Sequence, residues 1–161
     1  MIDELPTRTA LTAAAFLLLA TGLSVLSVVG GDAVRDAARA LASHLGRVLD
    51  EVGGIDGTAV FRGGVGASGP FELPPSLAGS PYRIEVRASD VRVLSGAVVA
   101  VAALRTPVHP FAPDRDSYSN DDLRTLDAAI LSVGVRTPFV AERAARLVDG
   151  TPVVLTFVHL P

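Results

Sequence analysis

The residues best suited to chemistry gather in one segment, HPFAPDRDSYSNDD, which runs from His109 to Asp122. Four carboxylates lie close together in it, on Asp114, Asp116, Asp121 and Asp122. Hard cations such as Ca²⁺ are bound by several carboxylate and carbonyl oxygens. The segment lacks the ligand spacing and the glycine of an EF-hand loop. A loosely built calcium site is therefore the weaker interpretation, and a solvated loop followed by a helix cap is the stronger one.

The three histidines, His44, His109 and His159, fall in three different predicted elements. None has the H-x-x-x-H or H-E-x-x-H spacing of a zinc site. The chain has no cysteine, which excludes disulfides, thiolate metal ligands and cysteine nucleophiles. No serine lies in a G-x-S-x-G motif. The sequence thus contains no catalytic motif, and we expect neither enzyme activity nor a cofactor.

A glycine-rich run, GGVGASG, extends from Gly63 to Gly69 and is similar in composition to a phosphate-binding loop. That motif requires a lysine after the glycines, and all 14 basic residues of this chain are arginine. We therefore predict a flexible loop over residues 63–70. The net charge is −3 and no basic cluster is present, so nothing in the sequence indicates nucleic-acid binding.

These residues must be positioned by a chain whose most distinctive stretch is the uncharged run Thr9–Gly31. A helix needs about 20 apolar residues to cross a bilayer core about 30 Å thick. A buried helix of a water-soluble protein usually keeps a polar stripe, whereas this run has only scattered hydroxyls. A cleavable signal has a shorter apolar region, of about 7–15 residues, after a basic start. We predict an uncleaved single-pass transmembrane helix over 9–31, preceded by a short leader over 1–8.

The residues after this run predict an amphipathic continuation of the helix over 32–53. Apolar side chains recur every three or four positions, which places them on one helical face. Gly53 and Gly54 are typical of a helix C-terminus. The apolar stripe consists of Val34, Ala37, Ala38, Leu41, Leu45, Val48, Leu49 and Val52.

The remaining residues, 54–161, read as a β-rich domain. Residues 81–87 and 91–94 alternate between apolar and polar side chains, which is typical of strands with one wet face. The run 97–104 is apolar throughout, so we predict that both of its faces are covered. Together they predict an antiparallel meander whose other face is covered by the 32–53 helix. Further strands are expected at 58–62, 71–73 and 152–160.

Two shorter elements leave alternatives open. A helix over 121–131, capped by Ser119 or Asn120, follows the polar, proline-broken loop 106–122. A second helix is expected over 138–147. The apolar run LDAAILSVGV also fits a buried strand, so either helix can be a strand instead.

The predicted fold class is α+β, with a long N-terminal helix packed on a small antiparallel sheet. This arrangement resembles the type IV pilins. The segment LPPSLAGSPYRIEVRASDVRVLSG, Leu73–Gly96, resembles one found in uncharacterised pilin-like membrane proteins of haloarchaea. The resemblance extends over residues 9–104. A processed filament subunit and a fixed, pseudopilin-like anchor both fit it.

The resemblance implies a single-pass protein of the cell membrane with an extracytoplasmic C-terminal domain. Its role would be that of a structural subunit in an archaeal surface filament or secretion assembly. Its partners would be the lipid bilayer and other pilin-like subunits, contacted through the N-terminal helix. The alternative hypothesis is a membrane-tethered extracytoplasmic binding module that uses the 106–122 loop, because polar loops of this length are often functional.

Overall fold

A computed structural model describes residues 30–110 and 115–161, which form an α+β fold. The predicted leader and most of the predicted membrane span lie outside the described residues. None of the helices within the described ranges is long and apolar enough to cross a membrane. The elements are a helix at 30–53, β1 (Ala59–Val65), β2 (Glu72–Leu73), β3 (Arg83–Val86), β4 (Asp90–Ser95), β5 (Val98–Ala103), β6 (Ser117–Tyr118), α2 (Asn120–Asp127), β7 (Leu131–Gly134), β8 (Phe139–Val148) and β9 (Thr151–His159).

The chain divides into two compact units, Met1–Ala33 and Val34–Pro161. The second unit contains both sheets and the hydrophobic core. Of the first unit, the structure describes only residues 30–33, which are helical.

The long helix confirms the amphipathic pattern predicted over 32–53. Its apolar stripe is buried, with Ala38, Leu45 and Leu49 at most 2% exposed. The opposite face carries exposed charged residues. The helix ends where the Gly54 N–H donates to the carbonyl oxygens of Asp50 and Glu51, at 3.0 and 3.1 Å. Burial of one apolar face in this way usually stabilises a helix more than its intrinsic propensity does.

The C-terminal end of the helix also fixes the chain segment that follows β5. The carboxylate of Asp50 accepts hydrogen bonds from the backbone N–H groups of Arg105 and Thr106, at 2.7 and 3.0 Å. Gly53 lies against the Thr106 side chain, because a Cβ at position 53 would be 2.6 Å from the Thr106 Cγ2. A small residue at position 53 thus permits the close approach that the Asp50 hydrogen bonds require.

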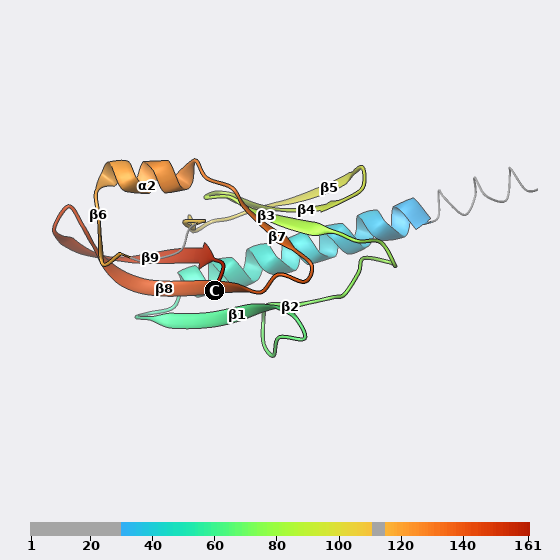
Figure 1. The fold of residues 1–161 in the computed structure, drawn as a ribbon, viewed down its shortest axis with the longest axis horizontal. Coiled ribbons are helices and arrows are strands. Elements are labelled where there is room, and N and C mark those ends of the chain that lie inside the picture. Colours follow the sequence, from blue (N-terminus) through green and yellow to red (C-terminus); the bar gives the residue numbers. More distant parts are fainter. Residues whose placement is uncertain (1–29, 111–114) are drawn as a thin grey trace, which may run out of the picture. The chain divides into compact units, whose positions relative to one another are not determined.

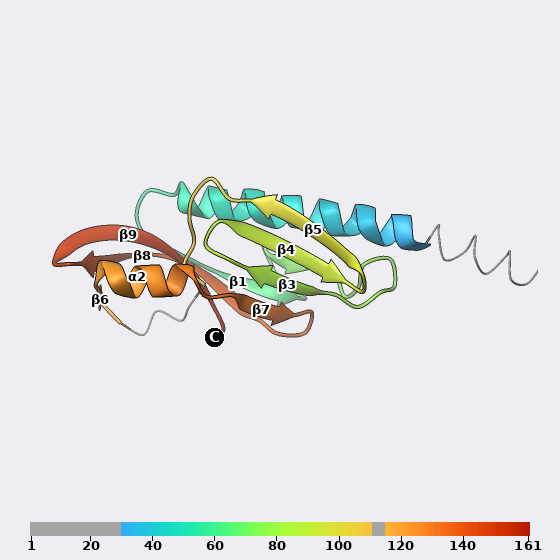
Figure 2. The same cartoon turned by 90° about the horizontal axis from the view of Figure 1, so that it is seen from above.

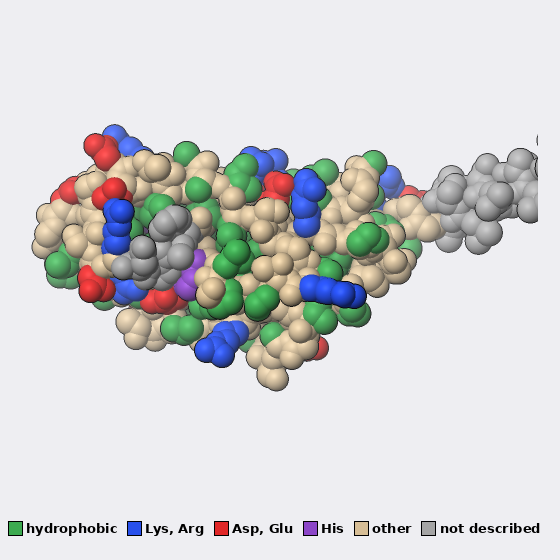
Figure 3. Space-filling view, viewed as in Figure 1, with side chains coloured by type: hydrophobic (Ala, Val, Ile, Leu, Met, Phe, Trp, Pro, Cys, Tyr) green, Lys and Arg blue, Asp and Glu red, His purple; other side chains and the backbone are tan. Residues whose placement is uncertain are grey.

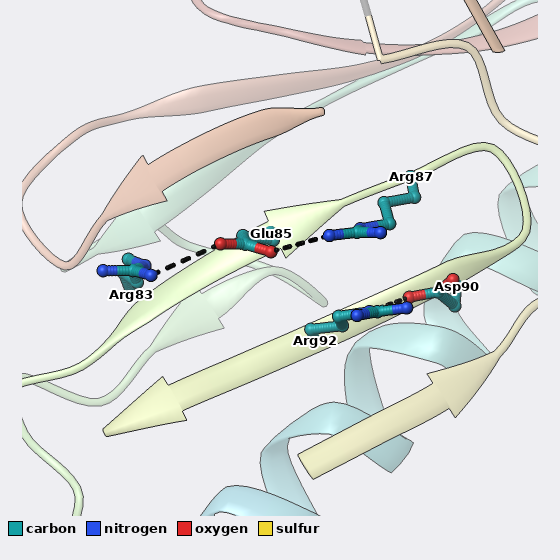
Figure 4. Close-up of polar contacts among 5 residues, drawn as sticks. All are labelled: Arg83, Glu85, Arg87, Asp90 and Arg92. Atoms are coloured by element: carbon teal, nitrogen blue, oxygen red, sulfur yellow. Dashed lines mark hydrogen bonds and ion pairs between the residues drawn. The ribbon is translucent and has the colours of Figure 1, made fainter. Parts of the chain in front are cut away.

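The first sheet has four antiparallel strands in the order β5-β4-β3-β7. The predicted meander of three sequential strands is therefore confirmed. Its inner face is apolar, and its outer face carries charged side chains that bind one another (Figure 4). Glu85 lies between Arg83 and Arg87, at 3.5 and 3.4 Å, and Arg92 contacts Asp90 at 2.6 Å.

The second sheet is mixed, in the order β2-β1-β8-β6, with β9 paired to β8. β8 is its central strand. It pairs antiparallel with β1 over residues 139–143 and with β9 over residues 140–148. β6 joins β8 in parallel at Leu147 and Val148.

The core lies between the two sheets, and the long helix fills the space between them alongside β5 and β4 (Figures 1 and 2). Leu45 and Leu49 of the helix join one cluster with Ile84 and Val93 of the first sheet. The second sheet contributes Phe139, Ala141 and Val158, and Phe71 joins them from the turn before β2. The Phe71 and Phe139 rings meet edge to face, with centroids 5.6 Å apart. The helix thus covers apolar surface of both sheets.

The segment between β2 and β3 is tied down by Tyr82. Its hydroxyl donates to the carbonyl oxygen of Pro74 at 2.6 Å, and the ring belongs to the core cluster. Burial raises the pKa of Tyr82 to about 12, because a phenolate is poorly solvated there.

The helix expected over 138–147 is instead a strand, as the alternative allowed, because Phe139–Val148 form β8. Their alanine, glutamate and arginine side chains favour helices in isolation. The segment instead lies between β1 and β9, which satisfy its backbone on both sides. Tertiary pairing overrides local propensity here.

Three further predictions need correction. The helix expected over 121–131 ends at Asp127, and Leu131–Gly134 is β7, as the strand alternative allowed. The loop expected over 63–70 begins later, because Gly63–Val65 belong to β1. The run 97–104 is not covered on both faces. β5 is an edge strand, and Val99 and Val101 are 54% and 56% exposed.

Gly63 provides a stability test of the core. A Cβ at this position would overlap the ring of Phe139, its neighbour across the β1–β8 pair. We expect Gly63→Ala to lower the free energy of unfolding by about 1–3 kcal/mol, because the packed ring must move. Chemical unfolding of the full chain, followed by circular dichroism, measures this. Gly30→Ala is the control, since nothing lies within 4 Å of a Cβ there. Equal stability of the two variants would contradict the packing argument.

Candidate functional site

The four candidate calcium ligands have separate surroundings wherever the structure describes them. Asp114 lies outside the described residues. Asp121 forms an ion pair with Arg124 at 3.4 Å, on the exposed surface of α2. Asp116 accepts a hydrogen bond through its backbone carbonyl from the Leu147 N–H. Over residues 30–110 and 115–161, no group of three or more His, Asp or Glu side chains is placed to hold a metal ion.

Asp122, the fourth candidate, completes a helix cap. Its carboxylate accepts hydrogen bonds from the backbone N–H and the hydroxyl of Ser119, at 2.8 and 2.9 Å. The Ser119 hydroxyl in turn accepts from the Asp122 N–H, so the predicted cap is a full capping box. The hydrogen bond from the Ser119 backbone N–H has the larger effect on the pKa of Asp122 and the bond from the Ser119 hydroxyl the smaller, and both lower it. The Asp122 carboxylate therefore helps to cap the N-terminus of α2. Calcium binding stays a prediction, because Asp114 lies outside the described residues.

The structure brings His109 and Asp127 together, which the sequence spacing did not indicate. The imidazole Nδ1 lies 2.7 Å from the Asp127 carboxylate at the end of α2. The side chain of His109 is 8% exposed and that of Asp127 is 42% exposed. His109 is held by its backbone, because its N–H donates to the Thr156 carbonyl and its own carbonyl accepts from the Val158 N–H. A segment expected to be a free loop is thus attached to the edge of β9.

An aromatic cluster supports this pair. Phe157 of β9 is fully buried, and its ring centroid lies 5.5 Å from that of His109 and 5.7 Å from that of Tyr118. The Arg146 guanidinium lies 5.8 Å from the same ring centroid. Side chains of Tyr118 on β6, Arg146 on β8 and His109 therefore surround the Phe157 ring of β9.

Next to this cluster, Glu142 of β8 contacts two basic groups. Its carboxylate lies 3.0 Å from Arg146 and 3.6 Å from His159. The remaining histidine, His44 of the long helix, lies 2.9 Å from the carbonyl oxygen of Pro70. The three histidines therefore lie in three separate environments, as their spacing predicted.

A histidine oriented by a carboxylate is half of an acid–base arrangement, because Asp127 fixes the position of the imidazole. Within the described part of the chain, no serine or threonine hydroxyl bonds to the other ring nitrogen. On the face shown in Figure 3, charged side chains are scattered among apolar ones and form no large patch of one sign.

Comparison with known proteins adds no family to this description. No protein-family model matches the chain, and no curated protein or solved structure matches it significantly.

The His109–Asp127 contact predicts how α2 is held. Asp127→Ala removes the carboxylate that bonds the imidazole, a contribution of about 1 kcal/mol for a typical hydrogen bond. We expect the amides of α2 to exchange about fivefold faster, with β8 and β9 unchanged. Hydrogen exchange followed by mass spectrometry measures both. Asp121→Ala is the matched control on the same helix, and equal acceleration in that variant would show that the His109 contact does not hold α2.

Proposed function

We propose that this chain is a membrane-anchored, pilin-like structural subunit of an archaeal surface filament or secretion assembly. The observation that supports this proposal most directly is the two-part character of the long helix and the sequence before it. Within Val34–Pro161, its apolar stripe is buried in the core of a β-rich domain. The sequence directly before it, Thr9–Gly31, has no charged residue and is long enough for a bilayer.

The exposed outer face of β5 supports a role in assembly. β5 reads VVAVAA, with no charge and no proline, and it is the outermost strand of its sheet. The long helix runs beside it, with Gly46 packed against Ala102 (Figure 2). An uncharged face with Val99 and Val101 exposed suits a protein that packs against neighbours.

Membrane anchoring is tested by fractionation of the full chain. We expect it to remain with membranes after a high-salt wash and to require detergent for extraction. Leu18→Arg places a charge at the middle of the predicted span and should release a large share of the protein, because a charge in the bilayer core costs about 3 kcal/mol. Val99→Arg adds the same charge on the exposed surface of β5 and should have no such effect. Full solubility of the native protein without detergent would rule out the proposal.

The N-terminus of the native protein separates two forms of the proposal. Cleavage near Thr9, seen by mass spectrometry, indicates a filament subunit. An intact Met1 indicates a fixed, pseudopilin-like anchor.

The second candidate function is the membrane-tethered binding module that uses the 106–122 segment. The observation that favours it is that both ends of this segment are fixed. His109 is bound to β9 and Asp127, and Ser117–Tyr118 form β6 against β8. A loop held at both ends is preorganised for a ligand.

In its calcium-binding form this alternative predicts thermal stabilisation. Millimolar Ca²⁺ should raise the melting temperature by roughly 2–5 °C when the ion is at about tenfold its dissociation constant. Asp116→Asn should remove the shift, whereas Asp36→Asn, on the exposed face of the long helix, should leave it. An unchanged melting temperature of the native chain at millimolar Ca²⁺ excludes this form.

A further inference from the structure

A groove on the second sheet is lined by two arginines and a glycine-rich backbone. Its walls are Arg62 of β1, the following residues 63–68, and Arg136 and Pro138 from the turn between β7 and β8. Gly64, Gly66 and Gly69 have positive φ, so the backbone turns without bulky side chains. Nothing lies within 4 Å of a Cβ at Gly66, which leaves this side of the groove open.

The two arginines differ from almost all other described arginines. On the first sheet, Arg83, Arg87 and Arg92 each contact a carboxylate (Figure 4). Over residues 30–110 and 115–161, only the side chains of Arg62, Arg105 and Arg136 form no hydrogen bond or ion pair. Arg105 lines a different groove, where Asp50 and Glu51 supply negative charge. Arg62 and Arg136 therefore share a groove that combines unpaired guanidinium groups with no lining carboxylate.

The nearest acidic side chains do not neutralise this groove. Glu142 is on β8, two residues from Val140, the register partner of Arg62, and it already contacts Arg146 and His159. Glu72 pairs with Gly64 across the β1–β2 ladder, does not line the groove, and makes no ion pair with Arg62. The local charge of the groove is thus positive in a chain whose net charge is −3.

The glycine-rich turn adds neutral donors. Two N–H groups of this turn already have acceptors. The Ala67 N–H donates to the Gly64 carbonyl, and the Gly64 N–H donates to the Phe71 carbonyl. The parallel register of Val65 with Leu73 engages the Gly66 N–H with the Leu73 carbonyl, because Pro74 has no N–H to complete the pair. Among the described residues, the N–H and the hydroxyl of Ser68 have no partner. Backbone N–H groups beside guanidinium groups are the usual ligands of tetrahedral oxyanions.

We propose that this groove binds a phosphate-type oxyanion through Arg62 and Arg136, with the N–H and hydroxyl of Ser68 as additional donors. The planar guanidinium matches two oxygens of a phosphate at once. A free phosphate compound and the phosphate of a phospholipid headgroup share this chemistry. The site is independent of the filament role, because it requires neither processing nor assembly.

Labelling with phenylglyoxal, which modifies free guanidinium groups, tests the site on the full chain. In neutral detergent, inorganic phosphate should slow modification of Arg62 and Arg136 by at least about threefold at saturation, as occupancy of a charge-assisted site predicts. Mass spectrometry reads each arginine separately. Arg124, which is 82% exposed on α2, is the internal control and should be modified at the same rate throughout.

Two variants make the assignment specific. Arg136→Gln should raise the phosphate concentration that half-protects Arg62 by about tenfold, the loss of one charge-assisted contact. Glu72→Gln should lower the half-protecting phosphate concentration, because it removes the negative charge on β2. Arg124→Gln is the control and should leave this concentration unchanged.

Labelling in lipid nanodiscs distinguishes a free phosphate compound from a phospholipid headgroup as the ligand. Protection of Arg62 and Arg136 by inorganic phosphate in detergent indicates a soluble ligand. Protection in phosphatidylglycerol nanodiscs but not by inorganic phosphate indicates a lipid headgroup. Modification of both residues at the rate of Arg124 in every condition, or equal protection of Arg124, would overturn the proposal.

Discussion

Burial of the long helix between two sheets is the constraint on which the rest of this domain depends. Each sheet has one apolar face, and such a face must be covered by another element. Leu45 and Leu49 reach both sheets at once, so the helix joins two layers that would otherwise leave apolar surface open beside β5 and β4. Asp50 and Gly53 then fix the chain leaving β5 against the helix. Helix, sheets and connecting chain therefore form one cooperative unit.

Features that depend on neighbouring residues could be predicted from the sequence. The three-and-four spacing gave the helix face, and alternation over 81–87 and 91–94 gave β3, β4 and their inner and outer faces. The sequence narrows the cap of α2 to Ser119 or Asn120, and Ser119 is the residue whose hydroxyl bonds to the backbone of the helix. In each case, the interaction that stabilises the element lies within a few positions along the chain. The α+β class follows from these local patterns.

Features that depend on distant partners could not be predicted. Phe139–Val148 has a helical composition and is a strand only because β1 and β9 flank it. The His109–Asp127 contact joins a sheet edge to a helix end, and no motif marks it. Whether a run such as 97–104 is covered on both faces depends on what packs against each face, and only the fold shows that β5 is an edge. The candidate site missed by sequence reasoning was therefore a product of tertiary contacts.

The distribution of unsatisfied groups indicates where this surface interacts. Charged side chains on the first sheet bind one another, so each of these arginines already has a carboxylate beside it. The outer face of β5 and the groove of Arg62 and Arg136 are different, since one presents exposed valines and the other unpaired charge. Folding gains little from an exposed unpaired guanidinium, because its interactions with water are retained in the unfolded chain. Such groups are most useful to a protein that binds something, and an exposed apolar strand face is most useful to one that packs beside another chain. The membrane-held subunit proposed above would use both kinds of surface.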